Sequence, residues 1–314
     1  MSIRIARYSP ELASEWKQVL EGSKNAIFPF ERPYLEYHGD RFVDMSLLAF
    51  VDDRPVALMP AAFDAANAKA ASHPGLTFGG IILERGLRGD GGIRVINAML
   101  DSLRDWGAQS CLVKLLPQAF ASYPAAEVEY ALWRRGFSLV RRDLSSILPL
   151  DHPLPFNASK SQGVKKAAKA GITVGSGSIS AFHDLLTEVL TAQHAVAPVH
   201  SKAELELLIG RFPGNIVIRC ATLADQVVAG TLVFKYGHVW HTQYLASSAQ
   251  GRSLGALDLV IAELMSEASA AGATQISLGT STVDQGMTLN EGLLWQKESY
   301  GARSLVHDFM EGKL

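Results

Sequence analysis

The sequence predicts two α/β domains of the same type in tandem, each a mixed, mostly antiparallel sheet flanked by helices. The length of 314 residues fits two domains of ordinary size. Matching motifs recur in the same order at nearly constant spacing, which is typical of a duplicated structural unit. They are Gly107-Ala108 with Gly272-Ala273 (272 − 107 = 165), Gly136-Phe137 with Gly301-Ala302 (301 − 136 = 165), and Arg88–Gly91 with Arg252–Gly255 (252 − 88 = 164). Three prolines in 149–156 place the boundary near residue 150, giving domains 1–150 and 151–314.

Composition indicates a globular protein with a substantial core, since 48% of the residues are hydrophobic and 19% are charged. The net charge of −2 excludes a global basic field that would attract DNA or an anionic membrane. Cys111 and Cys220 lie in apolar runs without metal-ligand spacing, so we expect reduced thiols and no metal. We find no secretion signal and no apolar run near the ~20 residues of a membrane span, and therefore expect a soluble, cytoplasmic protein.

The first half reads as a helix followed by alternating strands and helices. Ser9-Pro10 is typical of a helix start. Periodicity and turn residues then predict strands at 46–50, 56–62, 76–83, 109–116 and 139–150, loops at 65–72 and 85–92, and a short helix at 128–135. Between the loop at 85–92 and the strand at 109–116, a longer helix carries an apolar face made of Val95, Ile96, Met99, Leu100 and Leu103.

The second half repeats this order after three helical stretches. Helices are predicted at 159–170, 181–193 and 202–209, then strands at 216–222, 227–234 and 238–246. A loop at 247–256 leads into a helix from Leu257, followed by a strand at 274–278, a helix at 289–299 and a strand at 303–309.

The second half resembles the GNAT acyltransferase domain. The resemblance is carried by QVVAGTLVF (226–234), HVWHTQYLAS (238–247), AQGRSLGA (249–256), TQISLGT (274–280) and LLWQKESYGA (293–302). It implies that the strand after the hairpin splays from its neighbour to take the pantetheine arm of acyl-CoA. EYALWRRGFSLV (129–140) in the first half resembles the end of the same domain. The tandem arrangement is similar to the FemAB-like branch, whose members include peptidoglycan aminoacyltransferases, although the long helical arm of some members has no counterpart here.

The resemblance also implies a site for the donor, acetyl-CoA or another acyl-CoA. Its pyrophosphate would be held by Gln250, Gly251, Arg252, Ser253, Gly255 and Ala256. A glycine loop that leads into a helix presents backbone N–H groups at the positive end of the helix dipole. The match to the family's Q/R-x-x-G-x-G/A pattern is imperfect, and glycine at a strand-to-helix turn is also common without a ligand.

His241, Gln243 and Tyr244 form the predicted catalytic group. Acyl transfer to an amine needs a deprotonated amine, and neutral His is a suitable base near pH 7. Alternation along the strand puts His241 and Gln243 on one face and Tyr244 on the other. Gln243 and Tyr244 are expected to line the acyl pocket, with the backbone of 242–246 stabilising the oxyanion. The alternative for His241 is a buried side chain bonded to a neighbouring carbonyl.

Further polar residues are predicted to bind the acceptor, namely Lys114, Lys165, Lys166, His194, His200, Ser281, Asn290 and Lys297. The lysine cluster between Lys160 and Lys169 would hold a diphosphate between the two halves, although such lysines are more often a solvated face. Lys114 would reach the cleft between the halves or extend to solvent. Lys297 falls four residues before Gly301, where many GNAT enzymes carry a tyrosine acid.

The predicted function is transfer of an acyl group from acyl-CoA to an amine on a sugar, a nucleotide-linked sugar or a cell-envelope precursor. An O-acyl acceptor remains open. One alternative is a FemAB-type transferase that uses aminoacyl-tRNA and a peptidoglycan precursor, with the lysine cluster as its polyanion surface. The other is a non-catalytic GNAT-fold binding protein, favoured by the imperfect loop at Gln250–Gly255.

Overall fold

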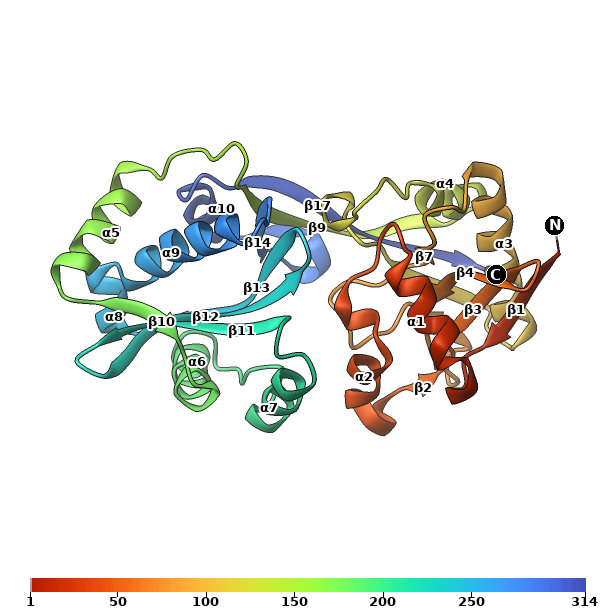
Figure 1. The fold of residues 1–314 in the computed structure, drawn as a ribbon, viewed down its shortest axis with the longest axis horizontal. Coiled ribbons are helices and arrows are strands. Elements are labelled where there is room, and N and C mark those ends of the chain that lie inside the picture. The colour runs from red at the N-terminus through yellow and green to blue at the C-terminus, as the bar shows by residue number, and fades with distance from the viewer. Residues whose placement is uncertain (1) are drawn as a thin grey trace. The chain divides into compact units, whose positions relative to one another are not determined.

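A computed structural model describes residues 2–314, apart from the side chains of Asp40, Gln193 and His194. The chain divides into two compact units (Figure 1). The first unit comprises the residues up to Asp143 with Gln285–Met287 and Val306–Leu314, and the second comprises Leu144–Asp284 and Thr288–Leu305. The chain passes between the units along two strands, β9 (Ser138–Pro149) and β17 (Arg303–Lys313), each of which has residues in both.

The first unit contains two groups of hydrogen-bonded strands, in the orders β1-β3-β4-β7 and β17-β8-β6-β5-β2. Its strands are β1 (Ile3–Arg7), β2 (Val43–Asp44), β3 (Leu47–Val51), β4 (Arg54–Met59), β5 (Ala62–Asp64), β6 (Lys69–Ala71), β7 (Ile82–Leu83) and β8 (Ser110–Lys114). Its α-helices are α1 (Ala13–Glu21), α2 (Arg32–Leu35), α3 (Gly89–Asp105) and α4 (Glu127–Arg134).

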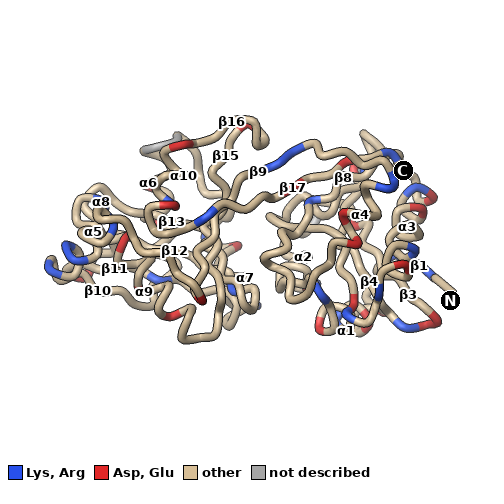
Figure 2. Tube along the Cα trace, turned by 90° about the horizontal axis from the view of Figure 1, so that it is seen from above, with Lys and Arg blue, Asp and Glu red and all other residues tan. Residues whose placement is uncertain are grey.

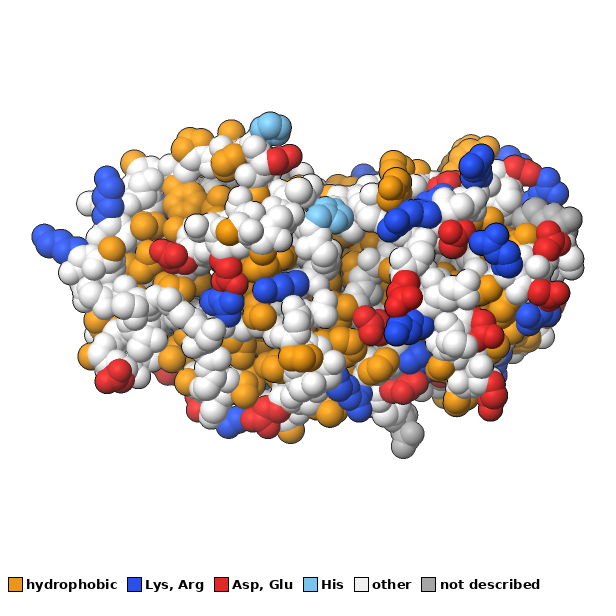
Figure 3. All heavy atoms as spheres, viewed as in Figure 1, with side chains coloured by type: hydrophobic (Ala, Val, Ile, Leu, Met, Phe, Trp, Pro, Cys, Tyr) orange, Lys and Arg blue, Asp and Glu red, His pale blue; other side chains and the backbone are white. Residues whose placement is uncertain are grey.

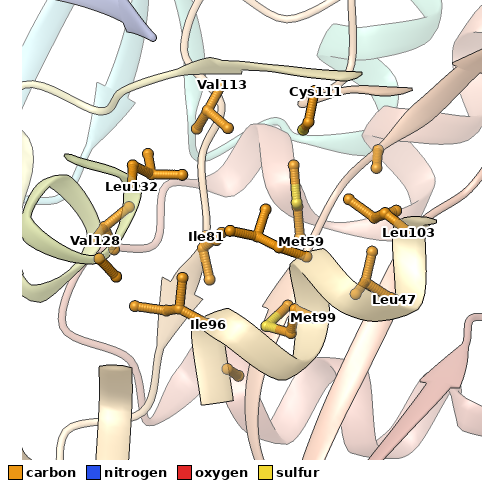
Figure 4. Close-up of a cluster of buried hydrophobic side chains, with 14 of the residues drawn as sticks. Leu47, Met59, Ile81, Ile96, Met99, Leu103, Cys111, Val113, Val128 and Leu132 are labelled. Atoms are coloured by element: carbon orange, nitrogen blue, oxygen red, sulfur yellow. The ribbon is translucent and has the colours of Figure 1, made fainter. Parts of the chain in front are cut away.

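The core of the first unit is built on α3. The five apolar residues that the sequence places on one face of this helix, Val95, Ile96, Met99, Leu100 and Leu103, are all fully buried. They pack with side chains of β3, β4, β8 and α4 (Figure 4). Burial of that stripe, at ~1.5–3 kcal/mol for each large side chain, is what holds the helix on the strands.

The second unit has the strand order β10-β11-β12-β13-β14-β9. Its strands are β10 (Thr173–Ser176), β11 (Ile216–Leu223), β12 (Gln226–Tyr236), β13 (Val239–Ser247), β14 (Gln275–Thr280), β15 (Thr282–Val283) and β16 (Thr288–Leu289). Its helices are α5 (Ala158–Lys169), α6 (Ile179–His194), α7 (Lys202–Arg211), α8 (Ala249–Leu254), α9 (Ala256–Ala270) and α10 (Glu291–Glu298). In Figure 1, α5 and α9 lie on one side of β11–β13, and α6 and α7 lie on the other.

Local sequence explains where these helices begin. The side chains of Asn157, Ser178 and Asn290 accept hydrogen bonds from backbone N–H groups in the first turns of α5, α6 and α10. Ser201 and Glu204 form a reciprocal capping box at the start of α7. These caps give hydrogen-bond partners to backbone N–H groups that a helix start otherwise leaves unpaired, and so stabilise the first turns of the four helices.

Two local predictions are wrong. The strand expected at 76–83 is reduced to β7, because Gly79 and Gly80 follow Pro74-Gly75 and Gly80 has a positive φ of 110°. The loop expected at 65–72 contains β6, whose short run Lys69–Ala71 pairs with β5 and β8. The small residues in these two segments are compatible with either a strand or a loop, and pairing with distant strands determines which one forms.

Candidate functional site

An opening between β13 and β14 is the centre of the candidate site. The two strands run parallel and pair only through Val239–His241 and Gln275–Ser277. Beyond this point β13 stays paired with β12, while β14 pairs with β9 after a register shift. Among the described residues, the edge of β13 after His241 therefore has no partner strand, and its backbone groups are available to a ligand. This is the splay that the GNAT resemblance implies.

A β-bulge at Gln243 decides which side chains share a face at this opening. The pairing of β12 with β13 shifts here and leaves Gln243 as the additional residue. Leu232 and Phe234, two apart on β12, lie opposite Tyr244 and His241 respectively. Because residues opposite each other share a face, His241 and Tyr244 share one as well. The alternation expected from the sequence, which separated them, is therefore wrong.

His241 is buried where the two strands part, with 5% of its surface exposed. Its Nδ1 lies 3.0 Å from Ser277 Oγ on β14, and its ring stacks on that of Tyr236, with 5.9 Å between the centroids. Ser277 and Tyr236 thus fix the orientation of the imidazole. The partner of the ring nitrogen is a hydroxyl group, where the sequence left a backbone carbonyl as the alternative.

Tyr244 and His200 are in direct contact, although 44 residues separate them in the sequence. Tyr244 Oη lies 2.7 Å from His200 Nδ1. His200 is buried in the segment between α6 and α7, and its carbonyl oxygen lies 3.2 Å from Nε2 of His183 on α6. Burial raises the pKa of Tyr244, against hydrogen bonds from the backbone at His200 and the side chain of Gln243 that lower it.

Lys297 places a buried cation beyond the point where the strands part. Only 5% of the residue is exposed, and its Nζ donates to the carbonyl oxygens of Gly279 (2.8 Å) and Thr280 (2.5 Å). Burial lowers the pKa of this amine to about 8. Both carbonyls belong to the part of β14 that has left β13, so Lys297 holds that segment in place.

The segment predicted as a pyrophosphate loop is a helix, α8, so the loop prediction is wrong. Ser248 begins it by accepting a hydrogen bond from the backbone of Gly251, and Gly255 ends it with a φ of 77°. Gly251 is buried, and a Cβ there would lie 2.1 Å from the carbonyl oxygen of Val228 on β12. Gly251 is thus required by the packing of α8 on β12.

Helix α5 lies directly on the end of this segment. A Cβ on Gly255 would lie 2.4 Å from the carbonyl oxygen of Gly163 on α5. Asp258, in the first turn of α9, accepts hydrogen bonds from Lys160 Nζ (2.9 Å) and Tyr300 Oη (2.6 Å). The positive end of the α9 dipole therefore already has a carboxylate of the same chain beside it.

A cleft of about 540 Å³ adjoins the other end of α8. Ser248 and Gln250 line it on one side, and the carboxylates of Asp184, Glu188 and Asp225 line it on the other. Three acidic side chains oppose the binding of a pyrophosphate at this end of the helix.

The lysines of the predicted cluster fall into two groups, those that bond to other parts of the chain and those that are exposed to solvent. Lys160 is paired with Asp258, and Lys166 Nζ donates to the Ser253 carbonyl oxygen at 2.6 Å near the end of α8. Lys165 and Lys169 are exposed and form no ion pair within the described residues. Lys and Arg positions gather at α5 along the trace in Figure 2, and Figure 3 shows basic side chains on the same end of the second unit.

Of the other residues predicted to bind the acceptor, most are buried or hydrogen-bonded within the chain. Lys114 Nζ donates to the carbonyl oxygens of Pro74 (2.9 Å) and Leu76 (2.7 Å), and burial together with Arg141 lowers its pKa to about 8. Ser281 is buried, and Asn290 caps α10. The side chain of His194 lies outside the described residues.

Three remaining donor-loop residues also have defined places. Arg252 donates to the Ser247 carbonyl oxygen at 2.6 Å, Ser253 Oγ donates to the Gln250 carbonyl oxygen at 2.8 Å, and Ala256 is fully buried. Their hydrogen bonds and burial are all within the second unit.

Sequence reasoning missed Ser277, Asp258 and Gly163. Ser277 is a polar residue inside the apolar run of β14, Asp258 interrupts the apolar start of α9, and Gly163 stands in the middle of α5. Each departs from the local pattern, but the partner that explains it lies on another element.

Two classes of feature are lacking in the described part of the chain. No group of three or more His, Cys, Asp or Glu side chains is arranged to hold a metal ion there. None of its helices is both long and apolar enough to cross a membrane.

Comparison with known proteins finds a GNAT domain in the second half and similar folds over the whole chain. Residues 159–285 match the acetyltransferase (GNAT) domain family. The fold is similar to that of FemX, with a TM-score of 0.70 at 13% identity over 99% of this chain and 97% of that chain. It is also similar to that of L-PGS from Bacillus licheniformis, with a TM-score of 0.62 at 13% identity over 97% of this chain and 92% of that chain. A tandem GNAT protein from the clavulanic acid biosynthesis pathway is similar as well, with a TM-score of 0.55 at 10% identity over 99% of this chain and 98% of that chain. No curated protein sequence matches significantly. The splayed strands and the match over 159–285 thus agree on a GNAT domain in the second half, and the fold of the whole chain is similar to that of FemX and of a tandem GNAT protein.

Proposed function

We propose that this protein is an N-acyltransferase that forms an amide at the opening between β13 and β14. The parting of the two strands after His241 and Ser277 carries the proposal. An acyl donor that lies along the unpaired edge of β13 would bring its carbonyl group to the buried end of the opening. Lys297 of α10 donates hydrogen bonds to the stretch of β14 that borders this opening.

The reaction follows from these groups. The amine nitrogen attacks the donor's carbonyl carbon, the new C–N bond forms, and the bond to the leaving sulfur or oxygen breaks. The amine gives up a proton and the leaving group takes one. Backbone N–H groups at the edge of β13 and the ammonium of Lys297 would stabilise the oxyanion that forms between these steps.

The donor favoured by the GNAT match is an acyl-CoA, and the acceptor we propose is an amine on a sugar or cell-envelope precursor. The domain match over 159–285 covers the opening and α8. Because α5 lies against Gly255, the diphosphate of such a donor would have to bind elsewhere or displace α5.

Aminoacyl-tRNA is the second candidate donor, and the same contact favours it. A donor without a CoA diphosphate does not need the turn that Gly163 covers. The exposed amines of Lys165 and Lys169 on α5 would then contact tRNA phosphates. The acidic cleft beside α8 also disfavours a diphosphate.

Amide formation by the full chain tests the proposal. The protein would be incubated with acetyl-CoA or with a mixed pool of aminoacyl-tRNA, each with a hexosamine, a nucleotide-linked amino sugar and a lysine-containing peptide. Mass spectrometry is expected to detect an amide with one donor class. Absence of amide with both donor classes would contradict the proposal.

Binding separates the two donors. Lys165→Glu with Lys169→Glu should weaken tRNA binding at least ~10-fold and flatten its salt dependence, because two phosphate contacts are lost. Arg88→Glu, an exposed charge reversal at the start of α3, is the control and should change little. If acetyl-CoA is the donor, calorimetry should show that it binds while tRNA does not.

A further inference from the structure

We propose that Tyr244 and His200 form the proton-transfer pair of this site. Tyr244 would exchange a proton with the reacting groups, and His200 would accept the phenol proton and later return it. The inference rests on the proposed acyl-transfer function and assigns to this pair the role of base that the sequence predicts for His241.

The bulge at Gln243 brings the pair to the site. It turns Tyr244 onto the face of β13 that carries His241, whose imidazole marks the end of the opening. Without the additional residue, Tyr244 would point to the face that packs on α9. Bulges commonly redirect a side chain next to an active site.

The contact between the two residues has the geometry of a strong hydrogen bond. Tyr244 Oη and His200 Nδ1 are 2.7 Å apart, and the rings meet edge to face with 5.9 Å between their centroids. His200 is 7% exposed, whereas Tyr244 is half-buried. Tyr244 is thus the more exposed member of the pair, as the group that exchanges a proton with substrate should be.

The hydrogen bond between Tyr244 Oη and His200 Nδ1 sets the path of transfer. When Nδ1 carries no proton, the phenol donates to it, so the phenol proton can pass to His200. Burial raises the pKa of Tyr244, and hydrogen bonding at His200 acts in the opposite sense by favouring the charged form.

The proton balance of acyl transfer then closes within the pair. As the amine nitrogen bonds to the carbonyl carbon, its proton passes to Tyr244 Oη, and the phenol proton passes to His200 Nδ1. When the bond to the leaving sulfur or oxygen breaks, Tyr244 gives a proton to that atom and recovers one from His200. No proton is gained or lost over the cycle.

Other titratable groups face the pair from three elements. His183 on α6 contacts the His200 carbonyl, Glu204 on α7 acts on Tyr244 through its charge, and His241 lies on β13 itself. From β12 the residue opposite Tyr244 is the apolar Leu232. His241 has Nδ1 engaged by Ser277 and lies deeper, which makes it a positioning residue in this scheme.

The test measures kcat and KM against pH with the donor and amine that form amide in the assay above. Tyr244→Phe should lower kcat about 100-fold with KM within about 2-fold, since general acid–base groups contribute roughly 10²–10⁴-fold. His200→Gln should lower kcat and remove the acid limb of the kcat profile. His183→Gln, whose ring contacts the His200 carbonyl oxygen and Thr187 Oγ1, is the matched control and should keep both kcat and the acid limb. His241→Gln should keep the acid limb.

A substrate-free measurement guards against loss of folding. Nitrogen NMR of the histidine rings should show His200 Nδ1 as a hydrogen-bond acceptor in the wild type and a shifted signal in Tyr244→Phe. If the wild type forms amide but Tyr244→Phe and His200→Gln keep its kcat and acid limb, the pair is not the proton carrier and acyl transfer still stands. If the wild type forms no amide, the proposed function fails and the pair's role fails with it.

Discussion

Gly163 and Gly255 meet backbone to backbone, so closely that a Cβ on Gly255 would lie 2.4 Å from the carbonyl oxygen of Gly163. The turn that the GNAT resemblance assigns to a pyrophosphate is thus covered by α5 of the same chain. Asp258 adds a carboxylate in the first turn of α9, at the end of the helix dipole that would otherwise attract a phosphate. The glycines of this segment are explained by packing and, at Gly255, by the positive φ that ends α8.

Gly255→Ala should therefore destabilise the protein through two effects. Alanine at a φ of 77° costs roughly 1–2 kcal/mol, and the contact with Gly163 adds about 1–3 kcal/mol of overpacking. Gly272→Ala is the matched control, because its φ of 80° imposes the same strain with no atom within 4 Å of the new Cβ. Urea denaturation should show a larger loss of unfolding free energy for Gly255→Ala, and equal losses would mean that α5 does not press on this turn.

Lys160 and Asp258 should be strongly coupled. Their side chains are 17% and 13% exposed, so removing either one leaves a buried charge without its partner. We expect Lys160→Met and Asp258→Ala each to cost about 3 kcal/mol, and the double variant to cost clearly less than the sum. The exposed pair Lys17–Glu21, with 76% and 68% exposure, is the control and should show coupling of about 0.5 kcal/mol or less. Additive losses at Lys160 and Asp258 would contradict this interpretation.

Lys297 should make stability depend on pH in the alkaline range. Burial lowers its pKa from 10.5 to about 8 in the folded protein, so between these values the unfolded chain binds a proton that the folded protein does not. Raising the pH through this window favours folding, by about 1–3 kcal/mol. The unfolding free energy of the wild type should rise relative to that of Lys297→Met between pH 8 and 10.5. Parallel pH profiles for the two proteins would show that Lys297 is not desolvated.

Deleting Gln243 should disable the site while leaving its chemical groups present. The deletion removes the bulge, so Tyr244 turns to the opposite face and loses His200. We expect kcat to fall at least about 100-fold, because misplaced catalytic groups lose their orientation. Gln243→Ala keeps the residue count of the bulge and should change kcat only a few-fold. A deletion variant with wild-type kcat would show that the shared face of His241 and Tyr244 is unimportant.

The elements that sequence predicts well are those with local causes. The stripe from Val95 to Leu103 predicts α3 and its buried face, because the 3.6-residue period reports burial directly. The tandem order of strands and helices also follows from repeated glycine stops, such as Gly136 and Gly301. The apolar stripe and each glycine stop can be recognised in a short stretch of sequence, and the repeat follows from comparing such stretches along the chain.

What sequence could not supply depends on pairing between distant segments. The bulge at Gln243 exists because β12 shifts register against β13, and no residue in HTQYL marks it. The contact of Tyr244 with His200 spans 44 residues, and no local pattern in the sequence links the two side chains. Gly251 and Gly255 match a ligand-binding loop by type, and only the positions of Val228 and Gly163 show that the chain itself fills the space.

The most direct test of the account is the rate of amide formation by Lys297→Met beside the wild type, with a donor labelled at its carbonyl carbon. Lys313→Met, an exposed lysine on β17, is the matched control. If the reaction takes place at the opening between β13 and β14, the wild type and Lys313→Met should form the labelled amide at equal rates. Lys297→Met should be at least about 10-fold slower with unchanged donor affinity, because a charge that stabilises the oxyanion is lost. Equal rates for all three proteins, or no labelled amide from either donor class, would contradict the account.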